Sequence, residues 1–301
     1  MNRRTYLKCA AGTSAMLSLG FNPFTDRVKT RVIPGSGEAL PMVGLGTWQT
    51  FDVGHNPIVK SELKEVLNTL VRLGGSVIDS SPMYGRSERV IGELSSSLGL
   101  NDRIFGATKV WTQGRSQGMD QMRRSMERMS QRPMDLMQIH NLVDWKTHLQ
   151  TLLDWKEKGI IRYVGITHYQ TSAYERMAQI IKNYPLDFIQ VNYSVGSPYA
   201  EDTLLPLAQD LGLGVIINRP YQGGSLFSQV RNKTLPPWTK EIECTSWAQF
   251  FLKFILSNPA VTCVIPGTSQ QPHIKENLEV GMGLLPDDKK RRQMLNYFRN
   301  L

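Results

Sequence analysis

Short apolar runs alternate with longer stretches of helical periodicity along most of the chain. After a predicted β-hairpin over residues 30–47, Leu63, Val66 and Leu70 recur at helical spacing, which predicts a helix at 60–73 and then a strand at 76–79. The same pairing recurs six more times. The further helices are predicted at 88–98, 119–129, 146–158, 173–183, 202–211 and 247–256, and the strands at 104–110, 136–140, 163–167, 188–192, 215–218 and 261–265.

With a first strand beginning at Met42, this pattern contains eight strands separated by helices. The strands are continuously apolar, as expected for parallel strands that are covered on both faces. Eight units within about 260 residues favour a closed (β/α)8 TIM barrel over an open doubly wound sheet. No Gly-x-Gly-x-x-Gly motif follows the first strand, which disfavours a Rossmann fold. We therefore expect one barrel domain at 29–301, with the β-hairpin at its N-terminus.

The formal net charge of +9 over 301 residues raises the question of a nucleic-acid partner. Much of the excess is local, because Lys289, Lys290, Arg291 and Arg292 form one run that predicts a capped surface helix. We therefore expect no nucleic-acid partner. No cysteine or histidine cluster has the spacing of a metal site, so no metal is expected. Cys244 and Cys263 are expected to be buried free thiols, although their pairing is left open.

The first residues have the architecture of a signal peptide. Arg3, Arg4 and Lys8 precede an uncharged, mostly apolar stretch at 9–21, which is too short for a stable membrane span. The paired arginines resemble the bacterial twin-arginine signal. Residues 1–28 are therefore expected to engage the twin-arginine export machinery and to direct the protein to the periplasm. The alternative is a frayed extension on a cytoplasmic protein.

Ionisable residues end three successive predicted strands. Asp79 ends the second strand, Lys109 the third and His140 the fourth, and Tyr84 lies in the loop after Asp79. The C-terminal ends of barrel strands meet at one mouth, so these four side chains should converge there. An ammonium lowers the pKa of a nearby phenol, an imidazole can bind a substrate oxygen or relay a proton, and Asp79 can balance the charge of Lys109. Such a set suits the reduction of a carbonyl group.

The segment from Asp79 to Glu88, Asp-Ser-Ser-Pro-Met-Tyr-Gly-Arg-Ser-Glu, together with Lys109 and His140, resembles the aldo-keto reductase signature. The resemblance extends from the hairpin to Asn277. It implies that Tyr84 is the proton donor, that Lys109 and His140 tune it, and that Asp79 pairs with Lys109. It also implies direct hydride transfer from a nicotinamide to the carbonyl carbon of a small-molecule substrate.

The same resemblance implies a set of cofactor contacts. NADPH is expected rather than NADH, although His168 stands where asparagine is usual and Asn218 where many relatives have a stacking aromatic. Basic residues that some relatives place at 267 or 269 are also missing. The implied contacts are Thr167, His168 and Gln190 for the carboxamide, Asn218, Arg219, Pro220 and Gly224 for the pyrophosphate, and Pro266, Gly267, Thr268, Ser269, His273, Glu276 and Asn277 for the adenosine phosphate.

Aromatic residues in the loops suggest an apolar substrate pocket, with Trp48 and Trp111 as the candidates. The aromatics of these loops, which include Phe51, Tyr193 and Tyr199, could equally be packing. Two other functions remain open. One is a nucleotide-binding sensor or accessory subunit with little turnover, and the other is a lyase that uses Lys109 to form a Schiff base.

Overall fold

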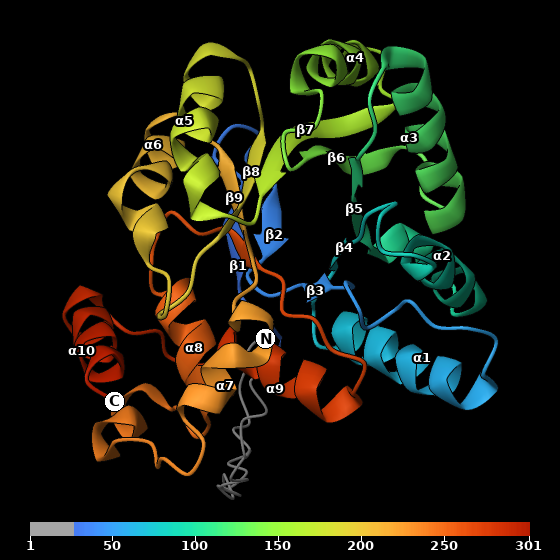
Figure 1. The fold of residues 1–301 in the computed structure, drawn as a ribbon. Helices are drawn as coiled ribbons and strands as arrows, with labels where there is room; N and C mark the ends of the chain where they lie inside the picture. The colour runs from blue at the N-terminus through green and yellow to red at the C-terminus, as the bar shows by residue number, and fades with distance from the viewer. Residues whose placement is uncertain (1–26) are drawn as a thin grey trace, which may run out of the picture.

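Residues 27–301 are described by a computed structural model, in which eight parallel strands form a barrel surrounded by helices (Figure 1). The strands are β3 (Leu45–Gly46), β4 (Val77–Asp79), β5 (Phe105–Val110), β6 (Met134–His140), β7 (Ile161–His168), β8 (Phe188–Asn192), β9 (Gly214–Asn218) and β10 (Cys263–Val264). Each pairs with the next in chain order. Parallel bridges from Val43 to Val264 and from Gly46 to Gly267 join the first strand to the last. The predicted (β/α)8 barrel is confirmed.

Helices connect the strands and cover the outside of the barrel (Figure 1). They are α1 (Pro57–Arg72), α2 (Ser87–Ser97), α3 (Arg115–Met129), α4 (Trp145–Glu157), α5 (Tyr174–Asn183), α6 (Leu204–Asp210), α7 (Ser225–Gln229), α8 (Trp247–Leu256), α9 (Gln271–Val280) and α10 (Asp288–Arg299). The seven helices predicted between strands are present with small shifts at their ends. Helix α10 also forms, and the side chain of Asp287 caps it by accepting from the amide of Lys290.

The barrel has two separate apolar layers. One lies between the strands and the helices, and the other fills the barrel interior. The predicted hairpin, formed by β1 (Thr30–Val32) and β2 (Ala39–Pro41), contributes Ile33 and Leu40 to the inner layer. There they pack with Val77, Phe105 and Phe188, which lie at or near the N-terminal ends of their strands. The hairpin therefore closes the N-terminal end of the barrel and leaves the C-terminal end for the site.

Side chains that point into the barrel change from apolar to polar along strands β4 to β9. Because strand side chains alternate between faces, positions two apart share the interior. Strand β5 thus carries Phe105 and Lys109 on the same face, and β6 carries Leu136 and Gln138 there. The apolar members lie toward the hairpin, and the polar members lie at the C-terminal ends. The fold therefore gathers buried polar groups at the mouth.

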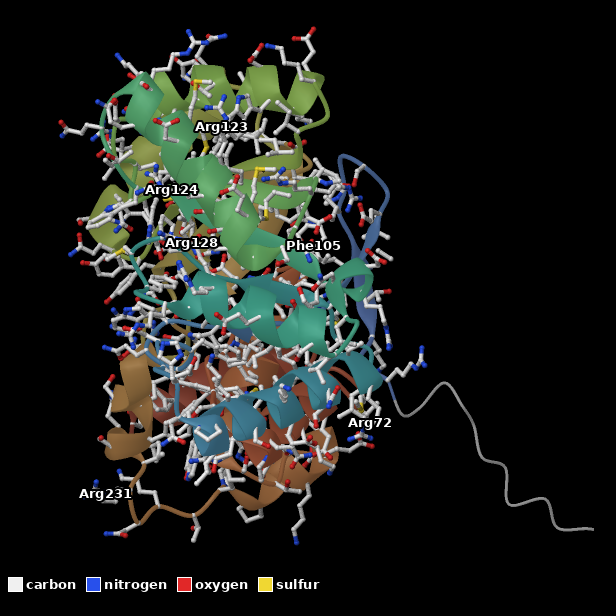
Figure 2. All side chains as sticks on the ribbon, turned by 90° about the vertical axis from the view of Figure 1, so that its right-hand side faces the viewer. Arg72, Phe105, Arg123, Arg124, Arg128 and Arg231 are labelled. Atoms are coloured by element: carbon white, nitrogen blue, oxygen red, sulfur yellow. The ribbon has the colours of Figure 1, made fainter. Side chains whose placement is uncertain are left out.

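Three arginines, Arg123, Arg124 and Arg128, project from the outer helix α3 (Figure 2). Of these three, Arg128 approaches a buried carboxylate, that of Glu88, at 3.5 Å. Within residues 27–301 no helix is both long and apolar enough to cross a bilayer, and no cluster of potential metal ligands occurs. Cys244 and Cys263 are both buried and free, as predicted. The predicted signal peptide lies almost entirely outside the described residues.

Candidate active site

A buried ion pair lies at the mouth of the barrel. The Nζ of Lys109 lies 2.5 Å from Oδ2 of Asp79, and the two side chains are 0% and 2% exposed. Lys109 also donates to the carbonyl oxygen of Ser80 at 2.7 Å. Charges taken out of water are costly unless they are paired and fully hydrogen-bonded. Asp79 and the Ser80 carbonyl satisfy two of the three N–H donors of the Lys109 ammonium and fix it at the ends of β4 and β5.

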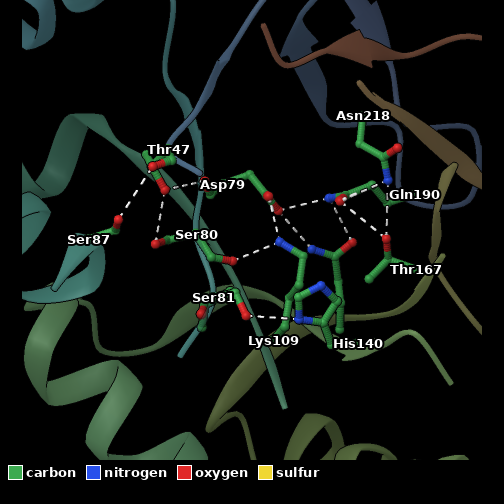
Figure 3. A network of polar contacts seen from close by, with 12 residues as sticks. Thr47, Asp79, Ser80, Ser81, Ser87, Lys109, His140, Thr167, Gln190 and Asn218 are labelled. Carbon is green, nitrogen blue, oxygen red and sulfur yellow. Dashed lines mark hydrogen bonds and ion pairs between the residues drawn. The ribbon is translucent and has the colours of Figure 1, made fainter. Parts of the chain in front are cut away.

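The second carboxylate oxygen of Asp79 is held by two buried amides. Gln138 donates to Oδ1 at 3.0 Å. Gln190 donates to the same atom at 2.8 Å (Figure 3). Gln190 also donates to Oε1 of Gln138 at 3.2 Å. A Cβ at Gly165 would lie 3.2 Å from Cγ of Gln138, so the missing side chain at Gly165 makes room for Gln138 inside the barrel. The ion pair is thus anchored from β4, β5, β6 and β8.

Tyr84 lies over this pair. The Nζ of Lys109 is 5.2 Å from the centroid of the Tyr84 ring, and the rings of Tyr84 and His140 meet edge to face at 5.8 Å. The loop that carries Tyr84 is fixed by Asp52, which accepts from the amide of Arg86 at 2.9 Å. Gly85 has a φ of +60°, and a Cβ there would lie 2.3 Å from Asp52. Only glycine fits this close approach without strain, so the loop geometry depends on it.

The net pKa direction at Tyr84 differs from the sequence prediction. Burial raises the pKa of Tyr84, and the positive charge of Lys109 lowers it by less, so the phenol titrates above its ordinary value. Burial lowers the pKa of Lys109, but the charges and hydrogen bonds of Asp79 and Tyr84 outweigh it, and the net pKa is raised. The prediction that the pKa of Tyr84 is lowered is therefore wrong, because the net shift of this pKa is upward. Tyr84 stays protonated and Lys109 stays charged at neutral pH.

His140 is an uncharged member of the site. Burial, followed by the positive charge of Lys109 and that of His168, lowers the pKa of His140 to about 2. Its Nδ1 lies 2.9 Å from Oγ of Ser81. A neutral imidazole keeps one N–H donor, which can bind an oxygen in the pocket. Of the two roles predicted for His140, hydrogen bonding to the substrate fits this protonation state better than a relay through an imidazolium.

A polar cluster continues along the ends of β7, β8 and β9 (Figure 3). Thr167 donates to Oε1 of Gln190 at 3.2 Å, and Asn218 approaches the same oxygen at 3.4 Å. Because Gln190 also donates to Asp79 and Gln138, both the N–H groups and the oxygen of its side-chain amide are hydrogen-bonded within the protein. The buried Oδ1 atoms of Asn218 and Asn192, which are register partners, accept no hydrogen bond among the described residues. These two oxygens are therefore the spare acceptors of the cluster.

The loops beyond these strand ends carry the remaining residues predicted for the carboxamide and the pyrophosphate. His168 is half-buried and stacks on Tyr169 at 5.7 Å, and burial lowers its pKa. Arg219 places its guanidinium 5.5 Å from the Tyr169 ring and has a φ of +49°. Pro220 is buried, and Gly224 has a φ of +95°. The Arg219 side chain thus lies against Tyr169, at the residue that follows Asn218 of the polar cluster.

The residues predicted for the adenosine phosphate lie between β10 and α9 and within α9. Pro266 accepts from the amide of Gly46, which ties this segment to the first strand. Glu276 accepts from the hydroxyl of Ser246 at 2.5 Å, and Asn277 accepts from the hydroxyl of Tyr221 at 2.7 Å. Gly267 and His273 are exposed, Ser269 is partly exposed, and Thr268 is buried. Glu276 and Asn277 are therefore engaged in internal packing, while the exposed positions face solvent.

The predicted pocket aromatics divide into two groups. Trp48 and Trp111 are 45% and 42% exposed, and the Trp111 ring lies 6.5 Å from that of His140. Phe51 and Tyr193, by contrast, are fully buried in the core. Trp111 is thus placed beside the candidate site, whereas Phe51 and Tyr193 are packing residues.

Gln138 and Ser81 are among the residues of the site that were not predicted from the sequence. Gln138 precedes His140 by two positions, so strand periodicity could have placed both inside the barrel. Ser81 lies in the loop before Tyr84, and nothing in the sequence indicates where its hydroxyl points. Both are fully buried and bonded to predicted site residues.

Comparison with known proteins agrees with this geometry. The model of the aldo/keto reductase family matches residues 42–292, which span the whole barrel. The chain belongs to the aldo/keto reductase family. Among curated members of this family, methylglyoxal reductase YeaE of Escherichia coli is 25% identical over 261 residues, covering 84% of this chain and 90% of the relative. The NADP-dependent D-sorbitol-6-phosphate dehydrogenase of Malus domestica is 23% identical over 284 residues, covering 81% of this chain and 86% of the relative.

Solved aldo-keto reductase structures show the same fold. An aldo-keto reductase from Klebsiella pneumoniae in complex with NADPH superposes with a TM-score of 0.74 at 22% identity, covering 90% of this chain and 95% of that one. The holo form of the aldo-keto reductase AKR11C1 from Bacillus halodurans also gives a TM-score of 0.74, at 19% identity. The match covers 90% of this chain and 96% of that one. At these identities the likeness establishes the architecture of the barrel.

Proposed function

We propose that this aldo/keto reductase family member is an NADP(H)-dependent oxidoreductase that reduces small aldehydes or ketones to alcohols. The observation that carries the proposal is the buried Asp79–Lys109 ion pair beneath Tyr84 and His140. Methylglyoxal is a suitable first test substrate, since the Escherichia coli relative is named for its reduction.

In the proposed reaction, Tyr84 donates its phenolic proton to the carbonyl oxygen. The ammonium of Lys109 stabilises the resulting phenolate, and Asp79 holds that ammonium in place. The N–H of the neutral His140 ring donates a hydrogen bond to the same carbonyl oxygen and polarises it. Trp111 provides an apolar wall beside His140. Bound NADPH would supply the hydride.

The residues present fit a nicotinamide cofactor. A carboxamide offers N–H donors, and the buried Oδ1 atoms of Asn218 and Asn192 lack donors among the described residues. Asn218 would therefore hold the carboxamide, with Thr167 and Gln190 supporting its side chain. Arg219 and the glycines of its loop would contact the pyrophosphate, and Thr268, Ser269 and His273 the adenosine phosphate. A fluorescence titration with NADPH and NADH tests the fit; no binding of either would contradict it.

The pH profile of reduction is a direct consequence of the Tyr84 environment. The active form is the neutral phenol, so activity is lost as pH rises through the Tyr84 pKa. Because burial raises that pKa, kcat is expected to stay level through neutral pH and to fall only above about pH 10. His140, with a pKa of about 2, is expected to add no acidic limb. Stopped-flow measurement of NADPH oxidation between about pH 5 and about pH 11 checks this. A fall centred below about pH 8 would contradict it.

We further propose that residues 1–28 direct export through the twin-arginine route to the periplasm. The support is the pair Arg3-Arg4 followed by the uncharged stretch 9–21. Expression in a bacterial host, followed by fractionation, should place the wild-type protein in the periplasm. A variant with both Arg3→Lys and Arg4→Lys should remain cytoplasmic. The same distribution of the wild type and the variant between periplasm and cytoplasm would contradict the proposal.

A further inference from the structure

Ser81 contacts the imidazole ring of His140 in the candidate active site. Its side chain is fully buried, and its Oγ lies 2.9 Å from Nδ1 of His140 (Figure 3). The backbone amide of Met83 donates to the same Oγ at 3.3 Å. Ser81 therefore sits between a fixed backbone donor and the His140 ring.

The direction of the Ser81–His140 hydrogen bond follows from the partners that are present. If Nδ1 of His140 donated, Oγ would accept from both His140 and Met83, and the buried hydroxyl hydrogen would have no acceptor among the described residues. A buried donor without a partner is strongly disfavoured. If Ser81 donates instead, both its hydroxyl and Nδ1 of His140 are satisfied: Oγ accepts from Met83 and gives its hydrogen to Nδ1.

This direction fixes the tautomer of His140. A neutral imidazole has one hydrogen, and a ring whose Nδ1 accepts must carry that hydrogen on Nε2. Nε2 makes no hydrogen bond with any described residue, so its N–H stays available for a ligand. The opposite tautomer would turn the Nε2 lone pair toward the carbonyl oxygen of a substrate, and the lone pairs of the two atoms would repel each other.

We propose that Ser81 is a positioning residue that locks His140 in the Nε2–H tautomer, so that the ring donates to the substrate carbonyl. This inference rests on the proposed reductase function, which gives the Nε2–H donor its purpose. Ser81 itself touches neither substrate nor cofactor. It acts through His140.

The test compares Ser81→Ala with Ser95→Ala in the full-length protein. Ser95 is also buried, but among residues 27–301 its hydroxyl bonds only to the carbonyl oxygen of Gly92, within helix α2 and away from the site. The tautomer is measured by long-range ¹H–¹⁵N NMR on protein with ¹⁵N-labelled histidine, and the His140 signals are assigned by their loss in His140→Asn. Turnover of a carbonyl substrate and the Kd of NADPH are measured on the same variants.

Wild type and Ser95→Ala are expected to show the Nε2–H pattern with a hydrogen-bonded Nδ1. In Ser81→Ala the Nδ1 resonance should move toward the value of a free acceptor. Its kcat should fall about tenfold, less than the 10²- to 10³-fold lost with a whole donor, and its NADPH Kd should stay within about twofold. A protonated Nδ1 in the wild type, or a normal kcat in Ser81→Ala, would overturn the proposal. The NMR comparison needs no turnover, so absence of wild-type activity would refute the proposed function separately.

Discussion

Replacing Tyr84 by phenylalanine is expected to lower the kcat for carbonyl reduction by about 10²- to 10⁴-fold. The substitution removes one oxygen and keeps the ring that packs against His140. Without that oxygen the site has no proton donor above Lys109, since His140 is neutral and Lys109 is held by Asp79. NADPH oxidation in the presence of a saturating carbonyl substrate measures the loss.

Two further measurements make the Tyr84 result specific. The Kd of NADPH for Tyr84→Phe should stay within about twofold of wild type, because no proposed cofactor contact uses the phenol. Tyr184→Phe is a matched control that should have a normal kcat, since Tyr184 is 40% exposed and lies between α5 and the N-terminal end of β8, at the end of the barrel opposite the site. A Tyr84→Phe variant with a near-normal kcat would remove Tyr84 from the mechanism.

Replacing Lys109 by methionine is expected to lower both activity and stability. The change leaves the Asp79 carboxylate buried with only amide donors and no counter-ion. Breaking a buried ion pair in this way costs about 3–5 kcal/mol of the free energy of unfolding, a large part of the total for a typical domain. Urea denaturation followed by circular dichroism measures the stability, and kcat should fall with it because the phenolate loses its stabilising charge.

Two companion variants isolate the charge effect at Lys109. In a double variant that adds Asp79→Asn to Lys109→Met, both charges disappear together, so most of the stability should return while activity stays low. Lys156→Met removes an exposed partner of Asp187 and should cost less than about 1 kcal/mol. A single Lys109→Met variant as stable as wild type, or a double variant no more stable than the single one, would contradict the assignment of the buried pair.

The barrel and the convergence of its ionisable residues were predictable from the sequence. Apolar periodicity distinguishes the strands from the helices, and the fold rule for barrels then brings together the residues that end successive strands. Asp79, Lys109 and His140 meet for this reason. Helix α9 was harder to predict, because it begins at Gln271-Pro272 without a side-chain cap and follows an irregular segment.

The remaining features of the site depend on geometry that residue order does not contain. The hydroxyl of Ser81 could have faced solvent, the core or the backbone, and only the folded loop turns it toward His140. The net pKa direction at Tyr84 is a balance between burial and the charge of Lys109, and the sequence gives no measure of burial depth. The hydrogen bond that Ser246 donates to Glu276 likewise follows from packing between α8 and α9.

The most direct test of the proposed carbonyl reduction is transfer of deuterium from NADPH labelled at the reactive nicotinamide C4 position. Purified protein would be incubated with the labelled cofactor and a panel of aldehydes and ketones that includes methylglyoxal, and the alcohol products analysed by mass spectrometry. We expect one deuterium on the carbinol carbon of at least one product, and none with Tyr84→Phe over the same interval. Tight NADPH binding by the wild type with no labelled alcohol from any carbonyl would contradict it.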